Sequence, residues 1–183
     1  MLLAIDVGNT NIVLGGIRDG EQVFSARLKS DRSKTADQYA LDIQGILTLY
    51  GVKPEEIEGG ILSSVVPYLQ SVLPDAVKLL TGVTLMIVGP GIKTGLNIRT
   101  DNPASVGSDL IVAAVAARAK YKTPIAIVDM GTATTLSLVM HDNEYMGGMI
   151  IPGLWTSLNA LSANAAQLPY IDLNGPAKLI GTN

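Results

Sequence analysis

The sequence predicts an α/β layered fold in which at least some of the strands are parallel. Short apolar runs alternate along the chain with segments of helical periodicity, which is typical of such folds. One pattern also occurs twice, at residues 2–11 and 125–135: an apolar run, an aspartate, one apolar residue, a glycine, and then polar residues. A continuous apolar run indicates a strand buried on both faces, so we expect each copy to end a buried strand.

The residues after the first aspartate are those expected around a polyphosphate. Gly8 has no Cβ and lets the backbone approach a ligand closely, while Asn9, Thr10 and Asn11 offer hydrogen-bond donors. Asp-x-Gly is also a common turn, and for one copy alone this simpler interpretation stays open. The presence of two copies favours the phosphate interpretation.

Composition excludes several classes of function. The 183 residues are 48% apolar and 16% charged, and the net charge of −3 with scattered basic residues argues against a nucleic-acid surface. There is no cysteine, so His141, the one histidine, has no thiolate partners for a zinc site. The N-terminus lacks the pattern of a signal peptide.

An uncharged stretch over residues 146–171 raises the question of a membrane span. It contains Gly147, Gly148, Pro152 and Gly153 as well as several amides, whereas a spanning helix is predominantly apolar. We therefore expect a buried helix of a cytoplasmic protein, with no membrane partner.

Hydrophobic periodicity, together with capping residues, glycines and prolines, predicts where the helices and strands of the first half begin and end. Thr35 is expected to cap an amphipathic helix that Gly51 ends, and Pro67 suits the first turn of a second helix, which Pro74 either kinks or ends. The expected strands cover residues 12–17 and 21–28, joined by a hairpin turn at 18–20, and residues 60–66 and 85–88.

In the second half, helices are expected at residues 111–120 and 154–166, and strands from 125, at 134–140 and at 145–151. Gly147 and Gly148 inside the last strand suit either the close approach of a ligand or a β-bulge. The segment 89–95 resembles a P-loop but fails its spacing, because Ile92 separates Gly91 from Lys93. A ligand-covering loop or a solvated turn fits better.

Asp109 lies where the helix over 111–120 begins. An acidic residue there is explained by capping or by the helix dipole, worth about 0.5–2 kcal/mol. The functional alternative is a general base whose ionised form the same dipole favours. Sequence leaves both interpretations open.

Taken together, these motifs are similar to those of the type III pantothenate kinases, members of the acetate and sugar kinase, actin and hexokinase superfamily. They occur in the family's order along the chain, at residues 6–11, 63–67, 91–96, 102–109, 129–135 and 147–153. The resemblance implies a duplicated ribonuclease H-like (actin-like ATPase) fold with a nucleotide cleft between two half-domains, 1–118 and 119–183. The sequence stops at Asn183 within the family's Ile-Gly-x-Asn-Thr motif, so a truncated chain with an incomplete second half is expected.

The function implied is ATP-dependent phosphorylation of pantothenate to 4'-phosphopantothenate, the first step of coenzyme A biosynthesis. Asp109 would be the general base, and Asp129 would help to hold a monovalent cation (potassium or ammonium). Asp6 would hold magnesium, directly or through water. The ATP-binding residues would be Asp6, Val7, Gly8, Asn9, Thr10, Asn11, Ile12, Val13 and Thr132, and the substrate-binding residues Gly107, Ser108, Asp109 and Leu110.

The family also forms homodimers, so a homodimer is expected. The apolar helix over 111–117 is a candidate contact, with packing inside the monomer as the alternative.

Two positions depart from the family pattern. Leu110 stands where the family usually has an arginine that can pair with the pantothenate carboxylate, and Thr100 stands where a tyrosine is common. An Arg–carboxylate bond is worth about 1.5–3 kcal/mol, so weaker substrate binding is expected unless Arg99 compensates. The alternatives are a catalytically weak or inactive homologue that binds nucleotide in a regulatory role, and a kinase for another small hydroxylated substrate.

Overall fold

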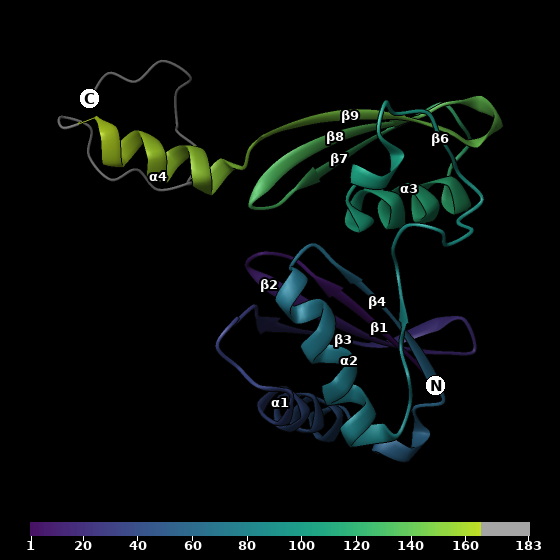
Figure 1. The fold of residues 1–183 in the computed structure, drawn as a ribbon, viewed down its shortest axis with the longest axis vertical. Coiled ribbons are helices and arrows are strands. Elements are labelled where there is room, and N and C mark those ends of the chain that lie inside the picture. Colours follow the sequence, from purple (N-terminus) through teal and green to yellow (C-terminus); the bar gives the residue numbers. More distant parts are fainter. Residues whose placement is uncertain (166–183) are drawn as a thin grey trace, which may run out of the picture. The chain divides into compact units, whose positions relative to one another are not determined.

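The computed structural model describes residues 1–165, and Figure 1 shows its elements. Two compact units can be distinguished. The first comprises residues 1–127 and 137–148, and the second comprises residues 128–136 together with the chain from 149 onward. The half-domain ranges expected from the motifs, 1–118 and 119–183, stay a prediction.

The first unit is built on a five-stranded mixed sheet. Its order is β3-β2-β1-β4-β5, with β1–β2 and β2–β3 antiparallel and β1–β4 and β4–β5 parallel, as the alternation of elements predicts. The strands are β1 (Leu2–Val7), β2 (Asn11–Arg18), β3 (Glu21–Lys29), β4 (Gly59–Ser64) and β5 (Met86–Ile87).

Local rules explain the β2–β3 hairpin. Asp19 and Gly20 form its two-residue turn with φ of 53° and 82°, and this double positive φ matches the right-handed twist of the flanking strands. The ladder shifts register by one residue between Gly16 and Ile17, at a β-bulge. The hairpin expected from the sequence is confirmed.

Helices α1 (Ala36–Leu49) and α2 (Pro67–Thr81) carry the apolar stripes that pack on this sheet (Figure 1). Thr35 caps α1 through a capping box with Gln38, and Gly51, at φ of 67°, follows its end. Pro67 is the first residue of α2, as expected, but the helix does not end at Pro74. The buried side chains of Leu73 and Ala76 on either side of Pro74 hold the helix on the core.

The main core lies on one face of the five-stranded sheet. Leu3, Ile5 and Val7 of β1 are almost fully buried in it, together with the inward faces of α1 and α2. The opposite side of β1 is open: Leu2 is 53% exposed and Asp6 is exposed. The expectation that β1 is buried on both faces is therefore wrong, because helices cover only one face of this strand among the described residues.

The second sheet has four strands in the order β6-β9-β8-β7, with β6 parallel to β9. They are β6 (Asn97–Ile98), β7 (Ile125–Met130), β8 (Ala133–Val139) and β9 (Glu144–Pro152); the two further helices are α3 (Ser108–Lys120) and α4 (Leu154–Asn164). Short 3-10 turns occupy Pro54–Glu56, Pro103–Ser105 and His141–Asn143. Among the strands of residues 1–165, β6 is the one that the sequence patterns do not predict.

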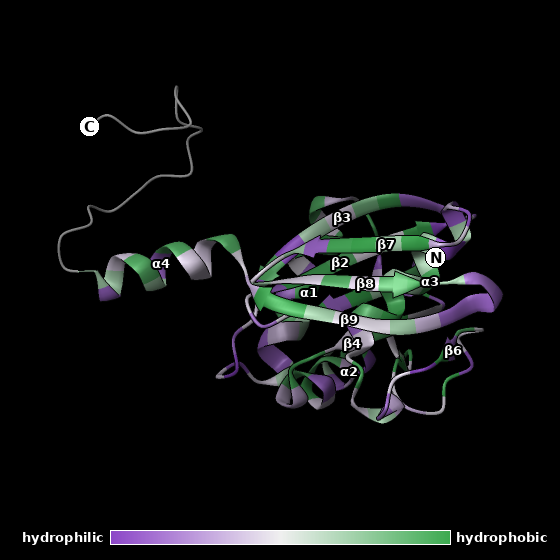
Figure 2. Ribbon diagram, turned by 90° about the horizontal axis from the view of Figure 1, so that it is seen from above, coloured by the Kyte–Doolittle hydropathy of each residue, from purple (hydrophilic) through white to green (hydrophobic). Residues whose placement is uncertain are grey.

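Two burial expectations fail in this region. Strand β7 is not buried, since Val128 and Met130 are 59% and 71% exposed, and α4 contains no buried residue. Figure 2 shows that β7 is nonetheless largely hydrophobic. Apolar composition favours burial, but burial needs a packing partner, and the described residues cover these side chains only in part. The remainder of the helix expected to reach residue 166 lies outside the described residues.

No helix within residues 1–165 is long and apolar enough to cross a membrane.

Candidate functional site

The turn between β1 and β2 carries the first Asp-x-Gly motif. Gly8 N–H donates to the carbonyl oxygen of Asn11 at 2.9 Å and closes the turn. A Cβ at Gly8 would lie 3.3 Å from that same oxygen, which is a tight contact. The glycine therefore permits a compact turn with its polar side chains on the outside.

The ATP-binding residues expected here differ in what they can offer a ligand. Buried side chains cannot reach a ligand and leave only backbone atoms for it, whereas exposed polar side chains can donate or accept. Val7 and Ile12 are buried and Gly8 and Val13 are half-buried, while Asp6, Asn9, Thr10 and Asn11 are exposed.

A pair of serines joins the end of β4 to α3. Ser63 is the register neighbour of Asp6 in the parallel β1–β4 pair, and its Oγ donates to Ser108 Oγ at 3.1 Å. Ser108 Oγ donates in turn to the carbonyl oxygen of Ser64 at 3.2 Å. The start of α3 is thus fixed at the end of the sheet where the first turn lies.

Asp109 lies in the first turn of α3, as expected. Gly107 is the N-cap residue and no side chain makes a capping hydrogen bond there, so capping does not explain Asp109. A Cβ at Gly107 would collide with Asp109 Oδ1, so this backbone position requires glycine if the carboxylate is to stay where it is. The helix-dipole and general-base interpretations both remain.

A cavity of about 590 Å³ opens beside the start of α3. Its volume is within the range of small-molecule sites. Gly107 and Ser108 line it, whereas Asp109 and Leu110 do not, and none of its lining residues is charged. The lining comes from the end of β4, the start of α2, the loop 88–94 that follows β5, and the segment 98–111. Residues of the loop 89–94 therefore line this cavity, and the ligand-covering interpretation of the loop stays a prediction.

The positions that depart from the family pattern have defined surroundings. Leu110 packs against a small apolar cluster that includes Ile111 and Tyr145. Thr100 Oγ1 is buried and has no hydrogen-bond partner among the described residues. Arg99 Nε is 3.2 Å from Glu144 Oε1, so its guanidinium is already paired with a carboxylate.

The second Asp-x-Gly motif forms the turn between β7 and β8. Gly131 N–H donates to the carbonyl oxygen of Ala133 at 3.0 Å. The carbonyl oxygen of Thr132 accepts two bonds, from Gly153 N–H at 3.1 Å and from Thr156 Oγ1 at 2.8 Å. Asp129 and Thr132 are both exposed.

The donor set can be tested against the metals that the resemblance implies. Within residues 1–165 no group of three or more His, Asp and Glu side chains is arranged to hold a metal ion. Magnesium commonly takes one or two carboxylates and completes its coordination with water and substrate phosphates. A single exposed carboxylate such as that of Asp6 fits this mode.

Sequence patterns did not identify the residues that support the two turns. Ser30 binds the first turn, through its Oγ to the Gly8 carbonyl oxygen at 2.6 Å and its N–H to the Thr10 carbonyl oxygen at 3.0 Å. Thr156 binds the second turn from α4. The hairpin turn at Asp19-Gly20 predicts the register of β2 against β3, and a regular ladder from that turn pairs Thr10 with the residue before Ser30. The one-residue difference is caused by the β-bulge, so strand register could have located Ser30 approximately.

Comparison with known proteins gives one consistent family. Residues 2–183 match the family described as type III pantothenate kinase. Proteins named type III pantothenate kinase from Halalkalibacterium halodurans and from Moorella thermoacetica are each 46% identical to this chain over 183 residues. Both alignments cover 100% of this chain and 72% of the relative.

Solved structures show the same fold class at low identity. A Campylobacter jejuni protein described as a Baf family transcriptional activator aligns with 96% of this chain and 68% of its own, with a TM-score of 0.54 and 18% identity. A Sinorhizobium meliloti protein described as a 2-dehydro-3-deoxygalactonokinase aligns with 82% of this chain and 53% of its own, with a TM-score of 0.50 and 15% identity. With the two mixed sheets, these likenesses confirm the predicted ribonuclease H-like α/β fold class.

Proposed function

Because this chain belongs to the type III pantothenate kinase family, we propose that it transfers the γ-phosphoryl group of ATP to the 4'-hydroxyl of pantothenate. The product is 4'-phosphopantothenate and the reaction is the first step of coenzyme A biosynthesis, in the cytoplasm. Asp6 to Val13 and Thr132 are assigned to ATP, and Gly107, Ser108, Asp109 and Leu110 to the substrate. The half-domain ranges 1–118 and 119–183 belong to the same proposal.

One observation carries the assignment of Asp109 as general base. Ser63 is the register neighbour of Asp6, and its hydrogen bond to Ser108 holds the start of α3 at that point. Asp109, the next residue of α3, therefore lies at the end of the sheet where the first turn lies. In-line phosphoryl transfer requires the acceptor hydroxyl to be oriented and deprotonated as its oxygen attacks phosphorus. Asp109 would take that proton, and the leaving group is ADP.

The cavity beside α3 supports the substrate assignment of Gly107 and Ser108, which line it. Valine, isoleucine and proline side chains in its lining suit the dimethyl group of pantothenate, and its glycines and hydroxyls suit the amide and the second hydroxyl. No charged residue lines it, Leu110 is packed on an apolar cluster and Arg99 is paired with Glu144. We therefore expect a higher KM for pantothenate than an arginine at position 110 would give.

Metal ions would supply charge neutralisation when bound. Asp6 is assigned to magnesium, directly or through water, and Asp129 to a monovalent cation, potassium or ammonium. The two ion requirements can be tested separately: we expect removal of magnesium to abolish turnover, and replacement of potassium by sodium to lower it.

The deciding experiment is ADP release with and without pantothenate, comparing the protein with Asp109→Asn. Loss of a positioned general base is expected to lower kcat by about 10²- to 10⁴-fold while ATP binding persists. Asp75→Asn, a matched change of an exposed carboxylate on α2, is the control and should leave kcat unchanged. ATP binding without pantothenate-dependent turnover in the parent protein would instead support a non-catalytic, nucleotide-binding homologue. Turnover only on a different hydroxylated compound would support another substrate.

A homodimer is also proposed, on family grounds. Ile111 and Ala114 of α3 are buried within the chain itself, which supports the packing alternative for these two side chains. Sedimentation equilibrium over a range of protein concentrations would measure the oligomeric state.

A further inference from the structure

The connection between β3 and α1, residues 30–35, touches every residue of the first turn. Ser30 binds the carbonyl oxygens of Gly8 and Thr10, as described above. Arg32 Nη2 donates to Asn9 Oδ1 at 3.2 Å. One short segment therefore determines the position of the whole turn and also places a guanidinium group on it.

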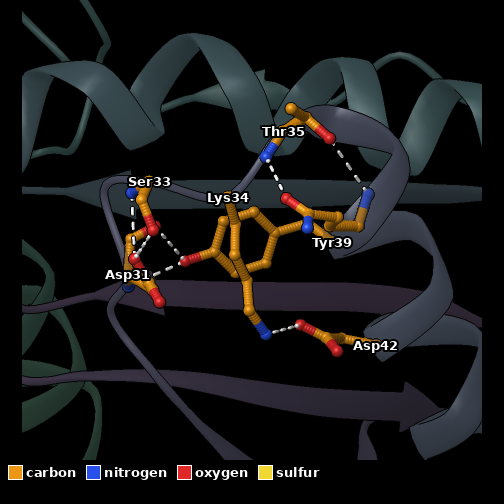
Figure 3. A network of polar contacts seen from close by, with 7 residues as sticks. Asp31, Ser33, Lys34, Thr35, Tyr39 and Asp42 are labelled. Atoms are coloured by element: carbon orange, nitrogen blue, oxygen red, sulfur yellow. Dashed lines mark hydrogen bonds and ion pairs between the residues drawn. The ribbon is translucent and has the colours of Figure 1, made fainter.

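This connection is itself held on the main core. Asp31 N–H donates to Tyr39 Oη at 2.9 Å, and Tyr39 O–H donates to the Asp31 carbonyl oxygen at 2.9 Å, while the Tyr39 side chain is completely buried. The Asp31 carboxylate accepts from the N–H and the Oγ of Ser33, at 2.9 and 2.6 Å (Figure 3). Arg32 lies between these two anchored residues, so its backbone has little freedom to move away from the turn.

The two cations of the connection have different partners. Lys34 Nζ is 2.6 Å from Asp42 Oδ2 (Figure 3), and this ion pair engages its charge. Arg32 is exposed, contacts the neutral amide of Asn9, and forms no ion pair with a carboxylate within residues 1–165. Among the described residues, no carboxylate therefore neutralises its charge.

The chemistry of this group matches polyphosphate. A guanidinium has five N–H donors in a planar fork, and the contact with Asn9 uses one of them. The fork fits phosphate oxygens in bidentate fashion, and charge-assisted bonds of this kind are stronger than neutral ones. Asn9 thus orients a cation at the edge of a turn assigned to ATP phosphates.

We propose that Arg32 is a binding residue for the phosphates of ATP, oriented by Asn9 and by the anchored 30–35 connection. This inference rests on the proposed function only in taking ATP as the ligand of the first turn. It assigns Arg32 no part in proton transfer or in binding the acceptor.

The test is equilibrium binding by isothermal titration calorimetry, which needs no turnover. Arg32→Gln is expected to weaken ATP binding about 10- to 100-fold, the value of one charge-assisted contact, and to leave adenosine binding unchanged. Arg32→Lys keeps the charge without the fork and should give an intermediate loss. A smaller loss for ADP than for ATP would place the guanidinium at the γ-phosphate, and an equal loss would place it at the inner phosphates.

Two matched variants distinguish a direct contact between Arg32 and the phosphates from the general effect of losing one positive charge. Lys29→Gln removes one positive charge from the residue that faces Asn11 in the β2–β3 ladder, and Arg18→Gln removes one at the other end of the same hairpin. Neither should weaken ATP binding more than about threefold, because screening and solvent reduce the effect of exposed charges.

Three results would overturn the proposal. Arg32→Gln could bind ATP as tightly as the parent, Lys29→Gln could lose as much ATP affinity as Arg32→Gln, or the parent could fail to bind ATP. If the parent binds ATP but phosphorylates nothing, and Arg32→Gln still loses ATP affinity, the binding role stands while the proposed function fails.

Discussion

The turn after β1 and the turn after β7 share an aspartate, one apolar residue and a glycine, yet different kinds of contact support them. The first is bound mostly by side chains: the Ser30 hydroxyl and Arg32 bind it together with the Ser30 N–H, and Tyr39 connects their segment to the core. The second is bound at the Thr132 carbonyl oxygen by Gly153 N–H and the Thr156 hydroxyl, and the Gly153 backbone lies very close to it. A local motif therefore specifies a turn, and distant residues specify how firmly that turn is held.

The two supports differ in their tolerance of change. A side-chain contact can be removed without moving the backbone. A close backbone approach cannot accept added atoms, since a Cβ at Gly153 would collide with the carbonyl oxygens of Gly131 and Thr132. Protein interiors respond to such overpacking by shifting backbone, at a cost of about 1–3 kcal/mol.

The largest effect is accordingly expected for Gly153→Ala. It should lower the free energy of unfolding by about 1–3 kcal/mol and weaken ATP binding, because the second turn must move away from β9. Denaturant unfolding and calorimetric ATP titration measure the two effects.

The control is Gly45→Ala in α1, where nothing lies within 4 Å of an added Cβ. That change should raise stability by about 0.5–1 kcal/mol, since alanine favours the helix. Equal stabilities for the two variants would show that the second turn has room the structure does not indicate.

A smaller effect is expected from removing one hydroxyl at each turn. Ser30→Ala deletes the 2.6 Å bond to the partly buried Gly8 carbonyl oxygen and should cost about 0.5–1.5 kcal/mol. Thr156→Val deletes the exposed 2.8 Å bond to the Thr132 carbonyl oxygen, which keeps its bond from Gly153 and gains water, so about 0.5 kcal/mol or less is expected. Thermal unfolding measures both losses of stability. A larger loss for Thr156→Val than for Ser30→Ala would contradict the expected order.

The sequence predicted what depends on neighbouring residues. The Asp19-Gly20 hairpin, the Thr35 cap, and the positions of Pro67 and Asp109 at helix starts all follow from backbone preferences over a few residues. The family and fold class were equally accessible, since several motifs recur in a fixed order.

Burial was predicted less well, for a physical reason. An apolar run shows that a strand favours burial, but it does not say which faces other elements cover. Leu2 and Val128 belong to such runs and are both more than half exposed. Helix α4 is a second example: its composition predicted a buried helix, but none of its residues is buried.

The supporting contacts of the site were the least predictable part. Arg32 follows the first turn by more than twenty residues, and only the pairing of β3 with β2 brings it back. A charged residue in a connecting segment is usually a solvated one, so its type alone gave no signal. The turn residues themselves were predictable, whereas the residues that orient them depend on sheet register.

The smallest expected effect concerns pH and again separates the two turns. The hydroxyl and then the N–H of Ser33 hydrogen-bond the Asp31 carboxylate and lower its pKa below the usual 3.8. A lowered folded-state pKa gives stability that is present above pH 3.8 and is lost as pH falls through the folded value. The bonds to the Thr132 carbonyl oxygen contain no group that titrates in this range, so acid should loosen the support of the first turn and leave those bonds intact.

Ser33→Ala tests this directly, because it removes the main cause of the lowered pKa. As pH falls below 3.8, the free energy of unfolding of this variant should decrease less steeply than that of the parent, because less stability remains to be lost through protonation of Asp31. Ser71→Ala removes a hydroxyl that donates only to the Tyr68 carbonyl oxygen and is the matched control, for which this decrease should match that of the parent. If the parent and Ser33→Ala lose stability equally as pH falls, the hydrogen bond between Asp31 and the Ser33 hydroxyl does not contribute to stability in acid.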